Sequence, residues 1–482
     1  MTRARRRAVV RGMGDATAIV WFRRDLRVHD HPALHAARAE NDRVIPLFVV
    51  DDALIHGRYA SPTRARFMLG CLAELDRALK DMGSGLVLRH GPPADAVVEV
   101  AREAGASAVY WTSDVAPYAR RRDTRVTGAL EDAGITARPC GGGYLVDVSK
   151  PRTQGGRPYT VFSPFHRAIA DVERRPVHRA PADLPPLPSG LRRGRLPSAE
   201  ALRLDPGVPD PIAEPGEDAA RAALQRWLDG PLDGYADRHD ALEGGTSILS
   251  PYLRWGCLSA RECEERADAR GGAGAAAFTR QLAWRDFYAH QLLMFPDNTN
   301  TEFQARYRDL RWEYDDEALQ AWKDGLTGFP LVDAGMRQLA HTGWMHNRAR
   351  LVVGSFLTKD LHLDWRDGER HFARLLLDGE PAQNNGNWQW IASTGADPAP
   401  YFRRMFNPMI QQRKFDPDGA YVRRWVPELR DVPVRRLPEP WTMSDAEQHD
   451  AGCVIGSDYP APIVDHAHER EVARQRYGAA AG

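Results

Sequence analysis

The sequence predicts an α/β N-terminal domain with a doubly wound parallel sheet, followed by a larger all-α C-terminal domain. Continuous apolar runs alternate with helical spacing up to about residue 145, and a segment rich in Pro, Arg and Gly follows. From Glu217 onward the apolar spacing is helical. We therefore expect a sheet domain over residues 16–145, an interdomain linker over 146–216 and a helical domain over 217–482.

Four apolar runs are the expected strands of the first domain. They cover residues 18–22, 44–50, 85–89 and 108–111, with helical spacing between them, for example over 64–82. Continuous rather than alternating apolar residues are typical of parallel strands that are covered on both faces. Such sheets bind ligands at the carboxyl ends of their strands. The chain has no Gly-x-Gly-x-x-Gly motif, so we do not expect the usual dinucleotide-binding fold.

The expected linker contains the run APADLPPLPSG, which can form neither a helix nor a central strand. We expect this segment to cross the surface of the molecule. Residues 158–165, PYTVFSPF, are the exception, and we expect them to be ordered and to pack against a domain.

Charge and composition exclude several classes of protein. The 65 basic and 65 acidic residues give a net charge of zero, which argues against a protein that coats nucleic acid, although a local basic patch remains compatible with it. No apolar stretch is long enough to span a membrane. The basic first 15 residues lack the features of a secretory signal, and Met13 is an alternative start. The five cysteines form neither a CxxC pair nor a disulfide framework, which fits a reducing cytoplasm. We also expect a monomer without a bound metal.

The segment over 335–408 concentrates aromatic and amide side chains. Four of the 13 tryptophans lie there, namely Trp344, Trp365, Trp388 and Trp390. A single Trp usually belongs to a core. Here two indoles flank Gln389, directly after an amide-rich stretch, and buried amides need hydrogen-bonding partners. The pattern predicts a pocket for a flat, conjugated molecule with hydrogen-bonding edges.

The motifs TGWMHNRAR, DGE, NNGNWQW and PYFRRMFNP resemble, in order and spacing, the catalytic flavin-binding domain of the DNA photolyase and cryptochrome superfamily. The N-terminal segment WFRRDLRVHDHPAL resembles the antenna domain of photolyases. The resemblance extends from about Ala16 to Tyr477 and is greatest to bacterial class I photolyases that act on cyclobutane pyrimidine dimers. It implies one FAD per chain.

The loop over 244–250 precedes Pro251, a residue typical of the first turn of a helix. Exposed amides and hydroxyls at such a position suit a phosphate, and a simple helix cap is the alternative. The resemblance assigns this loop to the FAD pyrophosphate. It also implies that Arg350 and Asp378 form a buried pair beside the isoalloxazine and that Asn384 lies next to flavin N5. The full set that it implies for FAD is Tyr235, Thr246, Ser247, Ile248, Leu249, Ser250, Phe278, Gln281, Arg285, Trp344, Asn347, Arg350, Asp378, Gly379, Glu380 and Asn384.

The resemblance further implies light-driven repair of cyclobutane pyrimidine dimers in damaged DNA, in which reduced FAD supplies one electron to the dimer. It gives catalytic positions to Gln281, Asn347, Trp284 and Trp390, the last two as an apolar clamp on the flipped dimer. Trp388, Trp365 and Trp312 match the family's electron-transfer chain, with Trp312 nearest solvent. Candidates for DNA phosphate contacts, with solvated surface polarity as the alternative, are Arg238, Arg348, Arg403, Gln411 and Lys414.

Two positions depart from the pattern of dimer-repairing enzymes. Gln281 stands where they usually have Glu, and Leu351 stands where they usually have Met. Gln281 also occurs in (6-4) photolyases, but those place two histidines where this chain has Asn347 and Leu351. We therefore rank (6-4) repair below dimer repair. A cryptochrome-like blue-light photoreceptor is the alternative from another class, and the short C-terminal segment argues against it.

The antenna domain of this family often holds a second chromophore. Members that use folate carry an Asn-Glu pair where this chain has Tyr118-Ala119. Asp114 and Tyr118 instead resemble members that use 8-hydroxy-5-deazaflavin, which is the antenna chromophore we expect. Methenyltetrahydrofolate, or an empty pocket, is the alternative.

Overall fold

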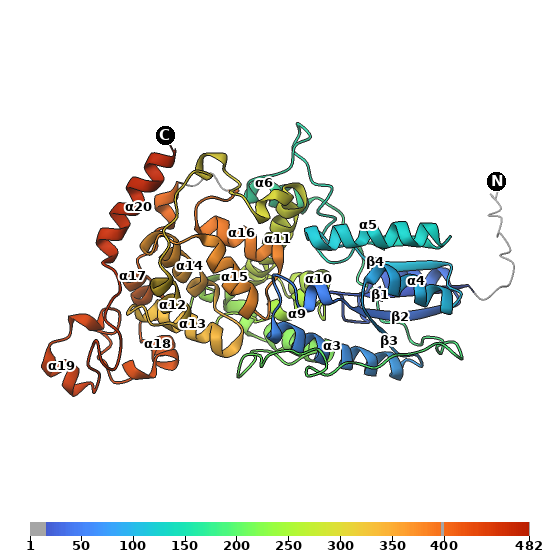
Figure 1. Ribbon diagram of the computed structural model, residues 1–482, viewed down its shortest axis with the longest axis horizontal. Helices are drawn as coiled ribbons and strands as arrows, with labels where there is room; N and C mark the ends of the chain where they lie inside the picture. Colours follow the sequence, from blue (N-terminus) through green and yellow to red (C-terminus); the bar gives the residue numbers. More distant parts are fainter. Residues whose placement is uncertain (1–15, 397–399, 482) are drawn as a thin grey trace.

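The computed structural model describes residues 16–396 and 400–481 (Figure 1). Five parallel strands form one sheet in the order β3-β2-β1-β4-β5. The strands are β1 (Thr17–Phe22), β2 (Arg43–Val50), β3 (Val87–His90), β4 (Ala108–Thr112) and β5 (Thr136–Cys140). The helices of this part are α1 (Pro32–Glu40), α2 (Asp52–Ile55), α3 (Pro62–Asp81), α4 (Pro93–Glu103) and α5 (Pro117–Asp132).

Alternate strand residues pack on opposite faces of the sheet. Ala18 and Val20 of β1 belong to a core with α1 and α3. Ile19 and Trp21 belong to a separate core with α4 and α5. Figure 1 accordingly shows α3 and α5 on opposite sides of the sheet. The predicted doubly wound parallel sheet is therefore confirmed.

Strand β5 was not among the expected strands. Its residues, TARPC, are largely exposed or half-buried, so the segment lacks the apolar run by which the other strands were predicted. It lies at the edge of the sheet, paired only with β4, where Pro139 is tolerated.

Between β5 and Glu217 the chain is largely irregular but contains α6 (Phe162–Ala170). Phe162 and Phe165 are buried in the core, as expected for this part of the linker. Phe165 packs on Phe287 of the helical part, with ring centroids 5.4 Å apart. The helix therefore anchors the connecting segment to the C-terminal domain.

From Glu217 onward the described chain is helical apart from isolated bridges, as expected. The α-helices are α7 (Glu217–Leu228), α8 (Tyr235–Arg238), α9 (Ser250–Trp255), α10 (Ala260–Arg270), α11 (Gly272–Met294), α12 (Asp316–Asp324), α13 (Pro330–Thr342), α14 (Asn347–Ser355), α15 (Trp365–Leu375), α16 (Pro381–Ile391), α17 (Pro408–Phe415), α18 (Ala420–Trp425), α19 (Asp445–Asp450) and α20 (His466–Ala481). A π-helical turn, Phe356–Asp360, continues α14.

One core joins the two parts of the molecule. Leu72 of α3 and Tyr252 of α9 belong to the same buried cluster as the α1 face of the sheet. The thiols of Cys71 and Cys257 meet in this cluster, with their sulfur atoms 3.4 Å apart, and all five cysteines are free. Among the described helices, none is long and apolar enough to cross a membrane.

Candidate active site

In the C-terminal part, α16 packs against both α11 and α14. Gln281 and Asn347 are exposed, although neighbours such as Leu282 and Ala349 are buried. Gln281 shares the face of α11 that carries Trp284 and Tyr288, as its spacing predicts. The predicted polar positions thus remain accessible on helices that otherwise belong to the core.

Asp378 is the centre of a partly buried hydrogen-bond network. Its Oδ2 accepts from Arg350 Nη2 at 2.8 Å and from the Ser250 hydroxyl at 2.7 Å. The indole Nε1 of Trp344 donates to Ser250 Oγ at 3.2 Å. Four residues that were predicted to contact one cofactor, from three separate parts of the chain, are therefore linked by hydrogen bonds.

The second oxygen of Asp378, Oδ1, is buried and has no hydrogen-bonding partner among the described residues. Buried acceptors are normally satisfied, so this oxygen calls for a donor that the described chain does not supply. A flavin nucleotide, with its imide and hydroxyl donors, can supply one. The residues present therefore fit FAD.

The loop before α9 has an unusual backbone. Gly244 and Gly245 have φ angles of 73° and 75°, and Ile248 has a φ of 51°. Left-handed backbone is a strained conformation for a β-branched residue and is characteristic of functional loops. A Cβ at Gly245 would lie 2.3 Å from the carbonyl oxygen of Arg238, so this position requires glycine. A loop of this kind can turn successive backbone N–H groups toward an anion.

Asn384 is hydrogen-bonded to a residue of α15. Its Nδ2 donates to the carbonyl oxygen of Glu369 at 2.9 Å, which fixes the side-chain amide. The neighbouring Asn385 donates to Glu369 Oε1 at 3.2 Å. Burial raises the pKa of the Glu369 carboxyl to about 7, since no cation is hydrogen-bonded to it among the described residues.

Three residues predicted for FAD contact other parts of the protein. Glu380 caps α16 by accepting from the Gln383 backbone N–H, and it also accepts from Arg24 at 3.1 Å. Arg285 donates to the carbonyl oxygen of Gly143 at 2.6 Å. Phe278 packs edge-on against Tyr235, which is itself a predicted FAD residue.

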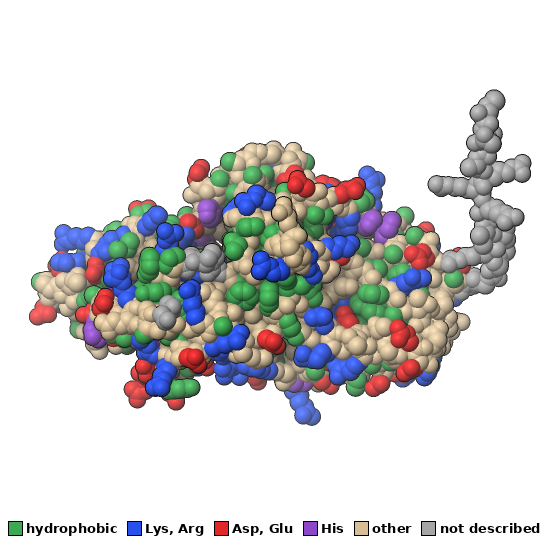
Figure 2. Space-filling model, turned by 90° about the horizontal axis from the view of Figure 1, so that it is seen from above, with side chains coloured by type: hydrophobic (Ala, Val, Ile, Leu, Met, Phe, Trp, Pro, Cys, Tyr) green, Lys and Arg blue, Asp and Glu red, His purple; other side chains and the backbone are tan. Residues whose placement is uncertain are grey.

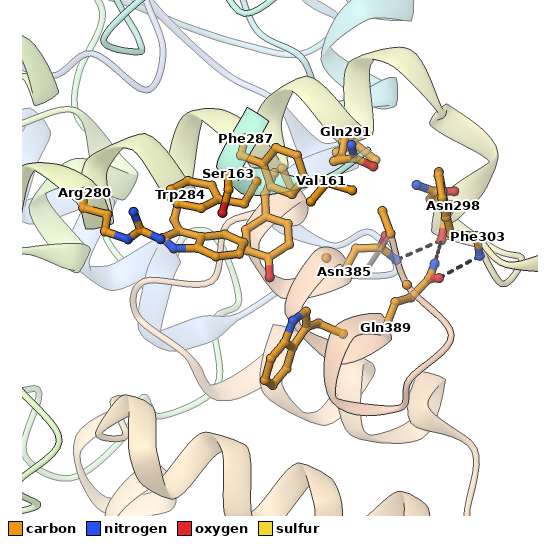
Figure 3. Close-up of a pocket in the computed structure, with 18 residues that line it drawn as sticks. Val161, Ser163, Arg280, Trp284, Phe287, Gln291, Asn298, Phe303, Asn385 and Gln389 are labelled. Carbon is orange, nitrogen blue, oxygen red and sulfur yellow. Dashed lines mark hydrogen bonds between the residues drawn. The ribbon is translucent and has the colours of Figure 1, made fainter. Parts of the chain in front are cut away.

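The two predicted clamp tryptophans each have one covered face. Phe162 stacks on Trp284, with ring centroids 3.7 Å apart and planes 6° apart. The guanidinium of Arg404 lies 4.2 Å over Trp390. Both indoles line a cavity of about 210 Å³ (Figure 3). Phe162 is a functional candidate that sequence reasoning missed in that role; its only signal was the aromatic PYTVFSPF run in an otherwise proline-rich segment.

The predicted electron-transfer tryptophans belong to one buried cluster. Trp388 and Trp365 are buried within it, and the half-buried Trp312 packs against it. This gradient matches the expectation that Trp312 is nearest solvent. Trp365 Nε1 donates to Glu302 Oε1 at 3.3 Å. Trp322, which was not predicted, packs edge-on against Trp388 at 6.2 Å.

The candidates for phosphate contacts differ in availability. Arg238, Arg403 and Lys414 are exposed. Arg348 is ion-paired with Asp240 at 2.5 Å, and Gln411 is half-buried. Figure 2 shows basic side chains spread among apolar ones over the middle of one face, without a single dense basic patch.

A second, much smaller cavity lies at the carboxyl ends of β1 and β4, the point at which the strand order reverses. Arg24 crosses it and donates to Asp114 at 2.9 Å and to Glu380 at 3.1 Å. Burial alone would raise the pKa of Asp114, but Arg24 and Arg23 lower it to about 2. The Tyr144 hydroxyl and Arg254 Nη1 line this cavity region without a hydrogen-bonding partner in the described chain.

The free volume of this second cavity is about 20 Å³, room for little more than one water molecule. A three-ring deazaflavin does not fit this space while Arg24 bridges Asp114 and Glu380. The antenna chromophore expected at Asp114 stays a prediction.

The protein therefore consists of a parallel-sheet domain and a helical domain. The helical domain holds a carboxylate oxygen that the described chain leaves unsatisfied, as expected for a cofactor-binding domain. Comparison with known proteins agrees. Residues 18–186 match the family model described as DNA photolyase, and residues 278–479 match the one described as the FAD binding domain of DNA photolyase.

Similar proteins cover nearly the whole chain. The deoxyribodipyrimidine photo-lyase of Streptomyces griseus is 43% identical over 466 residues, which are 94% of this chain and 98% of that protein. A bacterial class III photolyase from Agrobacterium tumefaciens has a similar structure, with a TM-score of 0.91, 35% identity and coverage of 98% of this chain and all of that one. A Synechocystis cryptochrome gives a TM-score of 0.88 at 29% identity, covering 96% of this chain and all of that one. The chain belongs to the DNA photolyase family.

Proposed function

We propose that this chain is a light-driven enzyme that repairs cyclobutane pyrimidine dimers in DNA. The observation that carries this proposal is its similarity, over 94% of its length, to a protein named deoxyribodipyrimidine photo-lyase. The Asp378 network, with its unsatisfied oxygen, supports the flavin site that such an enzyme needs.

Ser250, Trp344, Arg350 and Asp378 would hold the FAD, together with the strained loop that contains Ile248. Bound FAD, once reduced and photoexcited, would supply one electron to the dimer and regain it after the cyclobutane ring has opened. The hydrogen bond from Arg350 orients Asp378, so that its second oxygen can accept a hydrogen bond. Asn384, fixed by its bond to the Glu369 carbonyl, presents a neutral amide that does not readily give up a proton.

A dimer stacked in a duplex must leave the helix to reach a buried cofactor. Trp284 and Trp390 form the apolar walls of the site, and each is stiffened by the group behind it, Phe162 or Arg404. Gln281 and Asn347 hydrogen-bond the edges of the flipped pyrimidines and exclude water from them. The exposed side chains of Arg238, Arg403 and Lys414 contact phosphates, whereas Arg348 and Gln411 are weaker candidates because their surroundings engage or bury them.

Trp388, Trp365 and Trp312 carry electrons from the surface inward when the cofactor must be reduced. We assign the chain to the enzymes of class I, on the sequence motifs, although a class III enzyme is among its structural neighbours. Deazaflavin is the preferred antenna chromophore on the same basis, and its binding would require Arg24 to leave Asp114.

The deciding experiment uses purified, FAD-loaded and chemically reduced protein with DNA that carries one defined lesion. Blue light should remove cyclobutane dimers and leave (6-4) photoproducts unchanged, while dark samples keep both. Loss of neither lesion under light would overturn the proposal in favour of a photoreceptor, a class that the similarity to a Synechocystis cryptochrome makes the natural competitor.

A further inference from the structure

The cavity of about 210 Å³ extends beyond the two clamp tryptophans. It lies between α6, α11 and α16 and is also lined by residues of the loops around 298–303 and 395–396. Of the residues predicted for FAD or DNA, only Trp284 and Trp390 line it; Gln281, Asn347 and Asp378 do not. The cavity therefore adjoins the proposed dimer site but is distinct from the cofactor site.

The walls of this cavity suit a flat heteroaromatic ring. One side is aromatic, with Phe162, Trp284, Phe287 and Tyr288 packed on one another. The opposite side is made of amides, as Figure 3 shows for Asn298, Asn385 and Gln389. A cavity of about 150 Å³ is enough for a benzene ring, so this one has room for a larger ring system.

The amide side is rigid. Asn385 Nδ2 and Gln389 Nε2 both donate to the carbonyl oxygen of Asn298, at 3.0 and 2.8 Å. Gln389 Oε1 accepts from the backbone N–H of Phe303 at 2.9 Å. These bonds hold the wall in place before any ligand arrives.

One hydrogen-bond acceptor in the cavity wall is unsatisfied. Gln291 is only 4% exposed, and its Nε2 donates to the carbonyl oxygen of Tyr159. Its Oε1 is buried without a donor in the part of the chain that the structure describes. A buried acceptor of this kind requires an N–H or O–H partner, and a ring with an N–H edge would provide it.

We propose that this cavity binds the nucleobase that directly neighbours the pyrimidine dimer in the same strand. The inference rests on the proposed function, since it is the flipped dimer between Trp284 and Trp390 that brings this base to the cavity mouth. Every nucleobase has an apolar face that can pack against the aromatic side of the cavity and an N–H group for Gln291 Oε1. Arg280, exposed at the rim with its guanidinium 4.8 Å over Phe162, can contact the phosphate that links base and dimer.

The test measures dark binding of the FAD-loaded protein to duplexes with one thymine dimer by fluorescence anisotropy. Three duplexes carry an abasic site immediately 5′ of the dimer, immediately 3′ of it, or four nucleotides away. Removal of the base from one flank should weaken binding about tenfold, the effect of one stacked base. The distant abasic site should have no effect.

Val161→Trp fills the cavity from its rim without altering α11 or α16. In this variant the intact and the abasic-flank duplexes should bind equally. Val172→Trp, an exposed apolar residue just beyond α6, is the matched control and should keep the tenfold difference. Ser163→Phe fills the same cavity from a neighbouring exposed position and replaces Val161→Trp if that protein does not load FAD.

Equal binding of all three duplexes to the unaltered protein would overturn the inference, and so would a flank effect that persists in the filled variants. Repair under blue light separates this result from a failure of the proposed function. If the dimer is still repaired, only the neighbouring-base site is wrong. If the dimer is neither bound preferentially nor repaired, both are wrong.

Discussion

Two carboxyl groups near candidate chromophore sites have pKa values that are shifted in opposite directions. At the carboxyl ends of β1 and β4, Asp114 is ion-paired with Arg24, and the pKa of its carboxyl falls to about 2. Under the helical site, Glu369 has only an amide partner hydrogen-bonded to its carboxylate, and burial raises its pKa to about 7. The Asp114 site has its carboxylate paired with Arg24 and leaves about 20 Å³ of free volume. The helical site leaves Asp378 Oδ1 buried without a hydrogen-bonding partner in the described chain.

The difference indicates which region is built for a ligand. A site whose charges are paired by the protein gains little from a new partner, because binding must first break the existing pairs. A site with buried unsatisfied groups gains those hydrogen bonds at once. The helical site thus offers an unsatisfied hydrogen-bonding group to its cofactor. The Asp114 site can bind a chromophore only if Arg24 moves.

The largest effect should come from Asp378→Ala, which destroys the helical network. Arg350 would then be a partly buried cation without its carboxylate. Breaking a buried ion pair in this way lowers the free energy of unfolding by about 3–5 kcal/mol. FAD affinity should fall by two orders of magnitude or more, measured by flavin fluorescence titration. Asp316→Ala on the exposed side of α12 is the control and should retain FAD. A flavin content equal to that of the unaltered protein would contradict the role of the Asp378 network in FAD binding.

Trp388→Phe should nearly abolish photoreduction of oxidised FAD. Indole is oxidised by one electron far more easily than a phenyl ring, and Trp388 is the innermost member of the predicted chain. Repair by chemically pre-reduced protein should be unchanged. Trp322→Phe, which alters the indole packed edge-on against Trp388, is the control. If photoreduction is lost in Trp322→Phe and kept in Trp388→Phe, electrons reach the flavin through Trp322 and not through Trp388.

Gln281→Leu should weaken dimer repair roughly ten- to hundredfold, because a lost hydrogen bond that leaves a buried group unpaired costs about 1–3 kcal/mol. Gln281→Glu should keep or raise the repair rate. Neither variant should create (6-4) repair, since Asn347 and Leu351 stand where two histidines are needed. The measurement is the rate of repair of both lesions under blue light. Unchanged repair by Gln281→Leu would remove this residue from the site.

Arg24→Ala should enlarge the small cavity beside Asp114, at the carboxyl ends of β1 and β4. Co-expression with deazaflavin synthesis should then add an absorption band beyond that of FAD, at least as strong as in the unaltered protein. Asp114→Ala should reduce the band, because it removes the carboxylate that the resemblance assigns to this chromophore. Stoichiometric methenyltetrahydrofolate in the native protein would refute the preference for deazaflavin.

Sequence reasoning reached the fold where burial leaves a periodic pattern. The four buried strands and the helical half follow from apolar spacing, but β5 does not, because it is an exposed edge strand. The linker helix was expected to be ordered, yet its stacking on Trp284 joins residues far apart in the chain, which no local pattern encodes.

The site shows the same limit. Motif resemblance grouped Ser250, Trp344, Arg350 and Asp378, and these side chains do meet. It could not foresee that Arg24, from the other end of the chain, bridges Asp114 and Glu380 and fills the expected antenna pocket. Gln291 and Asn298 were also missed, because single amides outside a motif carry no signal.

The smallest expected effect tests the contrast between Glu369 and Asp114 directly. Glu369 has a folded pKa near 7, above its usual 4.5, so its stabilising contribution is complete below pH 4.5 and is lost as the pH rises through 7. Asp114 has a folded pKa near 2, below its usual 3.8, so its contribution is complete above pH 3.8 and is lost as the pH falls through 2. The two carboxyls therefore make stability depend on pH in opposite directions.

Glu369→Gln should be more stable than the unaltered protein at pH 8, by about 2 kcal/mol, and nearly equal to it at pH 5. Asp114→Asn should not flatten the fall in stability between pH 5 and pH 8. The measurement is the thermal midpoint of the FAD-loaded proteins at both pH values, where a few degrees of gain at pH 8 is expected for Glu369→Gln. Burial also raises the pKa of Asp286 to about 7, so some fall should persist in that variant. If Glu369→Gln gains nothing at pH 8, Glu369 is already compensated in the folded protein, and the contrast between the two sites fails.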